Sequence, residues 1–228
     1  MLEAESDLEA FSHALLHDLR APLRSICGYA ELVLGEDGAA LGPRGRNHLE
    51  RVTKAASRLD SLIQDVLTLY GVHKARIVQE RVNLEELLRT ILIEHRDFRR
   101  AAADVHVQRP LLSMRGHPAL LHQCVSHLLD NALKFVERGV KAKIRVWTES
   151  CGSDVRLWIE DNGIGIPKDS QDMVFGIFYR THQIGHYAGT GVGLAIVSRG
   201  INRMGGTVGV ESELGKGSRF WIQLPGAD

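Results

Sequence analysis

The sequence predicts two domains: a helical hairpin that dimerises as a four-helix bundle, and then an α/β sandwich in which helices cover a mixed sheet. Two patterns predict this division. Apolar residues recur at helical spacing as far as about residue 70, whereas short alternating strands and amphipathic helices follow residue 76. Residues 71–76 lie between the patterns and are expected to form a linker. We therefore place the domains at residues 1–74 and 75–228.

The first helix is predicted from residue 6 to about residue 34. At roughly 100° per residue, the apolar residues from Phe11 to Val33 share one face. His17 points away from that face and lies beside Arg20 and Arg24. This placement suits a histidine that accepts a phosphoryl group, although the helix alone favours an ordinary surface histidine. Pro22 is expected to bend or loosen the helix near His17.

Residues 35–45 contain four glycines and a proline, and predict a loop that returns the chain antiparallel. The second helix then repeats apolar residues at alternating spacings of three and four, which is typical of a coiled-coil seam. The seam consists of Leu49, Val52, Ala56, Leu59, Ile63, Val66 and Tyr70. Because two helices cannot enclose a core of their own, the hairpin predicts a homodimer.

The elements of the second domain follow from alternation and capping signals. Asn83 is a good N-cap for a helix through Leu92, with Glu86 at the third helical position. Pro118 is expected to open a longer helix that runs to Phe135. Strands are predicted at residues 77–82, 104–107, 111–114, 141–148, 154–159, 206–210 and 219–224.

Charge and composition exclude several classes of partner. Lys plus Arg and Asp plus Glu both number 28, so no net field attracts nucleic acid or an acidic membrane. The acidic start lacks the features of a signal peptide, and no stretch has the 18 or more apolar residues of a membrane span. Three scattered cysteines indicate neither disulfides nor zinc. We expect a soluble, cytoplasmic chain without membrane insertion.

Two glycine-rich motifs predict a nucleotide site. Asp161 follows a predicted strand and opens the run to Pro167, in which Gly163 and Gly165 let the backbone approach a planar ligand while the carboxylate accepts a hydrogen bond from an exocyclic amine. An ordinary Asp-Asn-Gly turn explains this run equally well. The second motif meets a helix N-terminus, where backbone N–H groups favour phosphate. It consists of Gly189, Thr190, Gly191, Val192, Gly193 and Leu194.

Other phosphate motifs fit less well. The second glycine motif lies too late in the chain for a Rossmann fingerprint, and residues 215–218 lack P-loop spacing. Asn131 and Lys134 lie before both glycine motifs, about one helical turn apart. The Asn131 side-chain oxygen can bind Mg²⁺, and Lys134 can reach the phosphates that the ion bridges. A solvated lysine and a polar core asparagine are the alternative.

In this order the motifs resemble the transmitter region of bacterial sensor histidine kinases over nearly the whole chain. The segment from His17 to Leu23 is similar to the family's phosphoacceptor box, especially in phytochrome-like kinases. Residues 128–135 resemble the N box, 161–167 the first glycine box, 175–180 the F box and 189–194 the second glycine box. Residues 205–206 and 212–220 resemble the closing strands. The resemblance implies the Bergerat-type ATP-binding fold.

The resemblance also implies roles for individual residues. Asp161 would recognise the adenine amine, Asn131 would ligate Mg²⁺, and Lys134 with the glycine-motif backbone would hold the phosphates of ATP, helped by Arg180. His17 would attack the γ-phosphate, with Asp18 as general base or orienting group. The phosphoryl group would then pass to an aspartate in the receiver domain of a response regulator.

The chain departs from the family pattern at three places. His127 stands where the family usually has a second asparagine, which can make nucleotide affinity depend on pH. Ala21 stands where a threonine or asparagine often supports dephosphorylation of the response regulator, so we expect weak phosphatase activity. His182 and His186 have a helical metal spacing but no third ligand, which argues against zinc.

Two other functions compete with an ATP-dependent protein-histidine kinase. One is a phosphorelay module whose second domain has lost useful ATP binding; intact glycine motifs argue against it. The other is an ATP-operated conformational clamp, in which His17 would play no part. Because the hairpin begins so near residue 1, we expect the input signal to come from an upstream sensor domain or a separate sensory partner.

Overall fold

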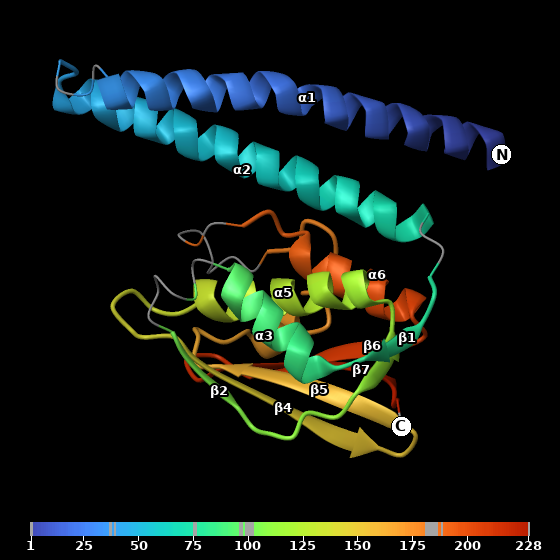
Figure 1. Cartoon of the computed structure of the whole chain (residues 1–228). Coiled ribbons are helices and arrows are strands. Elements are labelled where there is room, and N and C mark those ends of the chain that lie inside the picture. The colour runs from blue at the N-terminus through green and yellow to red at the C-terminus, as the bar shows by residue number, and fades with distance from the viewer. Residues whose placement is uncertain are drawn as a thin grey trace. The chain divides into compact units, whose positions relative to one another are not determined.

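The computed structural model describes residues 2–36, 38, 40–74, 77–95, 98, 103–180, 187 and 189–227, without the side chains of residues 2–17 and 70–74. The chain forms two compact units: Met1–His73 together with Ala188–Thr190, and Lys74–Tyr187 together with Gly191–Asp228. Helices and strands are labelled in Figure 1. Within the described residues, no helix has the uninterrupted apolar length that a bilayer crossing requires.

The first unit is the predicted helical hairpin. Helix α1 spans Leu2–Glu36 and continues through Pro22, and helix α2 spans Pro43–Lys74. The helices run antiparallel, as the ion pair between Arg20 Nε and Asp60 Oδ1 at 3.1 Å and the hydrogen bond from Arg46 to the Gly38 carbonyl show. Both helices are longer than predicted. The expected linker at 71–76 is wrong for residues 71–74, because one glycine costs a helix only about 1 kcal/mol.

Part of the apolar seam of α2 is buried against α1, and part of it is exposed. Ala56 and Ile63 are buried against Leu23 of α1, and Cys27 and Leu67 extend this small core. Val52 and Leu59, which belong to the same predicted seam, are 44% and 47% exposed. On α1, Leu19, Ile26, Tyr29 and Leu32 are likewise exposed. The hairpin therefore covers only part of its apolar surface by itself.

The second unit is a five-stranded sheet with the order β2-β4-β5-β7-β6, next to a two-stranded sheet of β1 and β3. Strands β2 and β4 are parallel, and the other neighbours in the large sheet are antiparallel. Helices α3, α5 and α6 cover one face (Figure 1). The strands are β1 Glu80–Val82, β2 Asp104–Val107, β3 Met114–Gly116, β4 Lys143–Cys151, β5 Asp154–Asp161, β6 Thr207–Glu213 and β7 Gly217–Pro225; the helices are α3 Leu84–Glu94, α5 Pro118–Lys134 and α6 Gly193–Arg203, with a short 3-10 turn at Lys168–Ser170.

Local signals place these elements well. Asn83 Oδ1 accepts hydrogen bonds from the Glu85 and Glu86 N–H groups at 3.0 and 3.3 Å and so caps α3 as predicted. Pro118 is the first residue of α5, whose N-cap side chain is His117. Two strand predictions need correction: residues 77–79 lie outside β1, and the strand expected at 111–114 begins only at Met114. Pro110 and its neighbours remain irregular because a proline cannot donate to a strand ladder.

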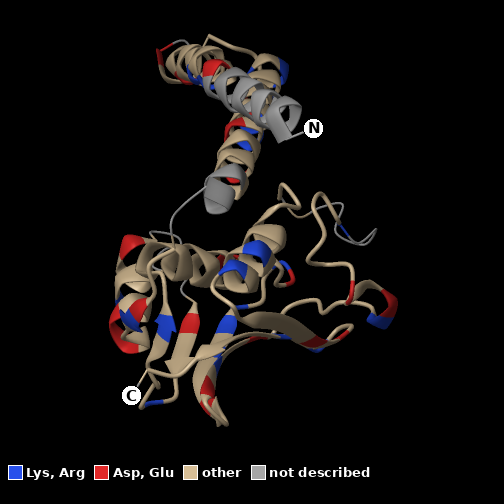
Figure 2. Cartoon of the chain, turned by 90° about the vertical axis from the view of Figure 1, so that its right-hand side faces the viewer, with Lys and Arg blue, Asp and Glu red and all other residues tan. Residues whose placement is uncertain are grey.

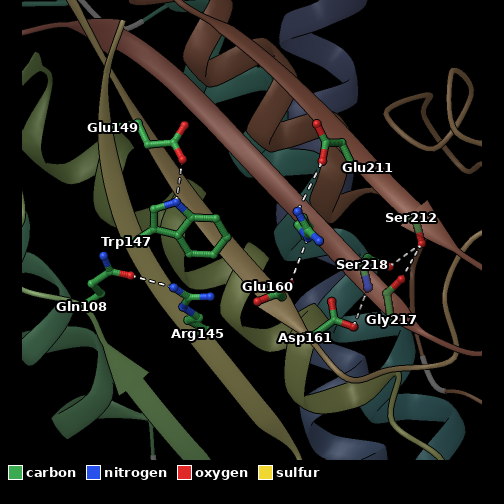
Figure 3. Close-up of polar contacts among 11 residues, drawn as sticks. Gln108, Arg145, Trp147, Glu149, Glu160, Asp161, Glu211, Ser212, Gly217 and Ser218 are labelled. Carbon is green, nitrogen blue, oxygen red and sulfur yellow. Dashed lines mark hydrogen bonds and ion pairs between the residues drawn. The ribbon is translucent and has the colours of Figure 1, made fainter.

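The opposite face of the sheet carries all three tryptophans in one cross-strand row. Trp147 stacks on Trp158 with ring centroids 5.6 Å apart, and Trp158 contacts Trp221 at 6.3 Å. Glu149 accepts a hydrogen bond from the indole N–H of Trp147 (Figure 3). It accepts a second from the indole N–H of Trp158, and these bonds, with the charge of Arg156, lower the pKa of Glu149. The row stabilises the central strands on the side that the helices leave open.

Candidate active site

Asp161 lies at the end of β5, where its side chain is buried among backbone donors (Figure 3). Its Oδ1 accepts hydrogen bonds from the N–H groups of Gly163 at 2.8 Å and Ser218 at 3.2 Å. Burial raises the pKa of Asp161 to about 6; the two backbone donors act against this rise, and the charge of Glu160 adds to it. A buried carboxylate that remains ionised at neutral pH is a strong, directed hydrogen-bond acceptor.

Ser218 and the residues behind it hold this carboxylate in place. The Ser212 hydroxyl accepts a hydrogen bond from the Ile166 N–H at 2.8 Å and contacts the Ser218 hydroxyl at 2.9 Å. The Gln171 side-chain amide links the first glycine motif to β6 by donating to the carbonyls of Ile166 and Ser212. The sequence reasoning missed these supports. Residues 215–218 were considered as a P-loop and as part of the closing strands, but a serine paired with a distant aspartate leaves no local pattern in sequence.

The first glycine motif is tied to the end of α5. Ile164 N–H donates to the Phe135 carbonyl at 2.8 Å, and a Cβ on Gly163 would lie 2.6 Å from that oxygen. Gly165 has a φ of +71°, and a Cβ there would collide with the Glu213 carbonyl. We expected these glycines to open the backbone to a ligand. Their steric requirement in this structure is a close approach to the protein's own backbone.

Replacing Gly165 by alanine is therefore expected to lower the free energy of unfolding by more than 2 kcal/mol. Gly152 offers a matched control, because its φ is +67° and a Cβ there meets nothing within 4 Å. Gly152→Ala should cost about 1 kcal/mol, the price of the left-handed backbone alone. Urea denaturation of both variants measures the difference; equal losses would show that the contact with Glu213 does not constrain this motif.

The second glycine motif meets the N-terminus of α6, which begins at Gly193. The backbone N–H groups of a first helical turn have no intrahelical acceptor and favour an anion. Gly191 has a φ of +74° and its carbonyl accepts a hydrogen bond from the Phe178 N–H at 2.9 Å. Phe178 itself has a φ of +60°, which is strained for a residue with a side chain. The F-box segment is thus anchored to the glycine motif.

Helix α5 connects the two glycine motifs around Asn131. Its residue His127 faces Gly193, since a Cβ on that glycine would lie 3.3 Å from His127 Nδ1. One turn beyond Asn131, the Phe135 carbonyl bonds the first motif. His127, Asn131 and Phe135 follow each other at intervals of four, so all three lie on one face of α5. Asn131 is therefore placed between the two motifs, and it is partly exposed.

Aromatic rings accompany Lys134 at the same end of α5. The Lys134 ammonium lies 4.8 Å from the centroid of the Phe135 ring. That ring contacts Tyr187, with centroids 5.7 Å apart. The Tyr187 carbonyl also accepts a hydrogen bond from Arg180 at 2.9 Å. The sequence reasoning did not assign Phe135 or Tyr187 to the site, and Tyr187 carries no recognisable motif.

The other site residues predicted from the sequence differ in exposure, and some lie outside the described residues. Gly189, Thr190 and Leu194 are half-buried, and Leu194 lies in the first turn of α6. His182 and His186 lie outside the described residues. Among the side chains that are described, no three histidine, cysteine or acidic residues gather as metal ligands. In α1, His17 is helical but its side chain lies outside the described part, whereas Asp18 and Ala21 are exposed.

Comparison with known families identifies both units. The His Kinase A (phospho-acceptor) domain model matches residues 7–70, and the model of the histidine kinase-, DNA gyrase B- and HSP90-like ATPases matches residues 116–228. The chain belongs to the sensor histidine kinase family. It is a transmitter region, with a helical hairpin followed by a mixed-sheet ATPase domain.

Individual relatives agree with this membership. The sensor histidine kinase AruS of Pseudomonas aeruginosa is 35% identical over 94% of this chain and 22% of its own length. Cyanobacterial phytochrome A of Nostoc is 30% identical over 97% of this chain and 29% of its own. The crystal structure of full-length ShkA in complex with AMPPNP covers 96% of this chain and 46% of that one, with a TM-score of 0.72 and 29% identity. The transmitter thus spans about a quarter of the length of these sequence relatives.

Proposed function

We propose that this transmitter is the catalytic core of an ATP-dependent protein-histidine kinase, with a phosphoacceptor domain at residues 1–74 and a catalytic domain at 75–228. The observation that carries the proposal is the position of Asn131 between the two glycine motifs, on the α5 face that contacts both. Asp161 provides a buried acceptor at the end of the adjacent strand. A phosphate site and a base site therefore lie in one domain. We propose that this domain binds ATP and that the chain works in the cytoplasm.

Each end of ATP has a chemically suited group. Asp161 accepts a hydrogen bond from the adenine amine through Oδ2. Its Oδ1 already accepts from the N–H groups of Gly163 and Ser218, whereas no described residue donates to Oδ2. The phosphates meet the first turn of α6 around Gly191 and Gly193. Lys134 adds a positive charge one turn from Asn131, and Arg180 lies on the F-box side as a helper for the γ-phosphate.

The residues around Asn131 fit a magnesium ion held mainly by nucleotide. An amide oxygen is a suitable ligand, and Mg²⁺ commonly takes one or two protein oxygens together with phosphate oxygens and water. The described side chains contain no complete protein cage, which agrees with that mode of binding. The bound ion would neutralise phosphate charge. Asp130, beside Asn131, is already paired with His95 Nδ1 at 3.2 Å.

In the proposed reaction a nitrogen of His17 attacks the γ-phosphorus of ATP. The new N–P bond forms as the bond to the β-phosphate oxygen breaks, and ADP leaves with that electron pair. Asp18 accepts or orients the imidazole proton. The phosphoryl group then moves from His17 to an aspartate carboxylate of a response-regulator receiver domain. Positioning carries most of the catalysis, because the loose transition state requires little covalent help from the protein.

We further propose that the transmitter is a homodimer. The hairpin leaves Val52 and Leu59 of α2 exposed, together with Leu19, Ile26 and Tyr29 of α1. A second hairpin can cover these side chains and complete a four-helix bundle. Because the relatives are about four times longer than the transmitter, we propose that input arrives from a sensory segment or a separate sensory protein.

Phosphatase activity toward the response regulator is expected to be weak. Ala21 is exposed one helical turn after His17, and its methyl group cannot orient an attacking water. Ala21→Thr should raise dephosphorylation of a phosphorylated receiver domain by about tenfold, less than the roughly 100-fold or more that a positioned general acid or base contributes, because a hydroxyl only orients the attacking water. Ala55→Thr, also at an exposed alanine but on α2, is the control. Rapid dephosphorylation by the unaltered chain would contradict the expectation.

One experiment separates the proposed kinase from its alternatives. The chain is incubated with γ-labelled ATP and Mg²⁺, in parallel with His17→Gln and Asn131→Ala. Acid-labile label on the protein that disappears in both variants supports the kinase. ATP hydrolysis that persists at full rate in His17→Gln, without protein label in the unaltered chain, indicates a conformational clamp. A chain that binds no nucleotide indicates a relay module.

A further inference from the structure

Asn162 joins the end of β5 to the start of β4 through both polar atoms of its side-chain amide. Its Oδ1 accepts a hydrogen bond from the Lys143 N–H at 2.8 Å, and its Nδ2 donates to the Lys141 carbonyl at 3.0 Å. The regular pairing of the two strands ends one position earlier, at Ile144 and Asp161. The Asn162 side chain therefore satisfies the β4 backbone at the point where the β5 backbone leaves the sheet.

Strand β7 holds the other edge of this strand end. A Cβ on Gly217 would collide with the Asp161 carbonyl and lie 3.1 Å from the Asn162 Cα, so a residue with a side chain could not come this close. The Ser218 N–H, next along β7, donates to Asp161 Oδ1 (Figure 3). The end of β5 is thus fixed to β7 through backbone groups and to β4 through the Asn162 side chain.

The position of Asn162 bears directly on the carboxylate of Asp161. The Gly163 N–H, one residue beyond Asn162, is the second donor to Asp161 Oδ1. Its direction depends on the rotation of the peptide group between Asn162 and Gly163, which glycine itself restricts little. The anchored amide of Asn162 restricts that rotation on one side, and the hydrogen bond from Ile164 to the Phe135 carbonyl restricts it on the other.

The same hydrogen bonds fix the base site relative to helix α5. Residues 136–142 connect α5 to β4, and most of them are exposed. The first glycine motif holds both ends of this loop, because Ile164 donates to the Phe135 carbonyl and Asn162 donates to the Lys141 carbonyl. The span between the Asp161 carboxylate and the end of α5 is therefore set by these bonds.

Charge does not supply discrimination between purine bases. Basic and acidic residues are interspersed over the surface of the second unit (Figure 2), and nucleotides with the same number of phosphates carry the same charge. Recognition of an amine requires an acceptor held in one direction, because a hydrogen bond weakens steeply when it bends. Asp161 Oδ2 is such an acceptor only while the plane of the carboxylate is fixed.

We propose that Asn162 is a positioning residue that sets the preference of this domain for adenine over other purines. The inference rests on the proposed function, in which Asp161 accepts a hydrogen bond from the adenine amine. Without the two bonds to β4, the peptide group before Gly163 rotates, its N–H leaves Oδ1, and the carboxylate turns about its Cβ–Cγ bond. Affinity for adenine nucleotides then falls, whereas affinity for a purine without the amine changes little.

The test compares ADP with IDP, whose base has a carbonyl in place of the amine. Competitive displacement of a fluorescent ADP analogue from the full chain, with Mg²⁺, gives both dissociation constants. We expect the unaltered chain to bind ADP about 100-fold tighter than IDP, because a site that pairs a hydrogen-bonding group rejects a mismatch. Asn162→Ala should lower this ratio about tenfold, since the acceptor is loosened but not removed.

A milder variant covers the case in which Asn162→Ala folds poorly. Asn162→Asp keeps the acceptor for the Lys143 N–H and loses only the donor to the Lys141 carbonyl. It should lower the ratio of affinities by about threefold, less than the alanine variant does. Its added charge acts equally on ADP and IDP and so cancels in the ratio.

Asn83→Ala is the matched control for a structural role. Asn83 belongs to the same domain, and its side chain also makes two hydrogen bonds to backbone, with the N–H groups of Glu85 and Glu86. Its loss should lower the urea midpoint but leave the ratio unchanged, because a smaller folded fraction lowers both apparent affinities equally. A structural role for Asn162 would give the same result.

Two results overturn the inference while ATP binding stands: an unchanged ratio in both Asn162 variants, or an equal fall of the ratio in Asn83→Ala. An unaltered chain that binds ADP and IDP equally contradicts the proposed role of Asp161, and the inference fails with it. An unaltered chain that binds neither nucleotide contradicts the proposed kinase itself.

Discussion

Asn131→Ala is expected to reduce phosphorylation of the chain by ATP at least 100-fold. The reason is that the Asn131 amide oxygen lies between the two glycine motifs and is the proposed protein ligand of Mg²⁺, and loss of a group that stabilises developing charge commonly costs two to three orders of magnitude. The fold should persist, because Asn131 is partly exposed and the helix gains a better helix former. Initial rates with γ-labelled ATP measure the effect.

Asn202→Ala is the matched control for that substitution. Asn202 is also an asparagine on a helix, exposed near the end of α6, and its side-chain amide donates a hydrogen bond to Ser198 of the same helix. Phosphorylation should remain within twofold of the unaltered chain. Activity of Asn131→Ala that equals the control at saturating ATP and Mg²⁺ would remove Asn131 from the proposed mechanism.

Asp161→Asn is expected to abolish ATP binding while stabilising the domain. Asparagine can still accept the hydrogen bonds from Gly163 and Ser218 through its oxygen. Its amide N–H₂ then takes the place of the second carboxylate oxygen. Because this group and the adenine amine are both donors, no hydrogen bond can form between them. We expect nucleotide affinity to fall by at least 100-fold, because a site built to pair a hydrogen-bonding group discriminates strongly against a mismatch. Isothermal titration with an ATP analogue measures the affinity.

The gain in stability follows from the raised pKa of Asp161. Between its ordinary value of 3.8 and about 6, the folded chain holds a proton that the unfolded chain has released. The unfolding free energy therefore decreases as pH rises through this window, and the full cost of the buried charge is present above it. At neutral pH, Asp161→Asn should raise the unfolding free energy by about 1–3 kcal/mol.

The same titration makes the unaltered protein lose nucleotide affinity as pH falls below about 6, since protonation replaces an acceptor lone pair. Urea denaturation at neutral pH and near pH 4 should show the variant's advantage shrinking at the lower pH. Asp169→Asn, at an exposed acidic residue in the same loop region, should change neither property. A destabilised Asp161→Asn at neutral pH would contradict the assignment of a buried carboxylate whose pKa is raised by desolvation.

Periodicity and capping were sufficient to predict most of the fold. The spacing from Leu49 to Tyr70 indicated a helix with a seam, and Asn83 and Pro118 marked helix starts because their effects are local. The ends of helices were harder to predict. Gly71 did not stop α2, since the cost of one glycine is small compared with the propagation of a long helix.

The candidate site was predictable only where a motif is contiguous. Asp161 and Asn131 belong to short recognisable runs, whereas Ser218 acts on Asp161 from 57 residues away and Tyr187 reaches Phe135 from a segment without a pattern. The roles of Gly163 and Gly165 also required the structure. Their partners, Phe135 and Glu213, approach through backbone carbonyls, which no side-chain pattern encodes.

In the proposed reaction, His17 carries the phosphoryl group. The chain is phosphorylated with ATP and Mg²⁺, digested with trypsin under mildly basic conditions, and analysed by fragment mass spectrometry. Cleavage after Arg20 releases one peptide that contains both His13 and His17, so fragmentation must separate the two histidines. We predict one phosphoryl group on His17, none on His13, and no phosphoryl group on the His17→Gln variant. A phosphoryl group on His13 or on another residue, or its persistence in His17→Gln, would contradict it.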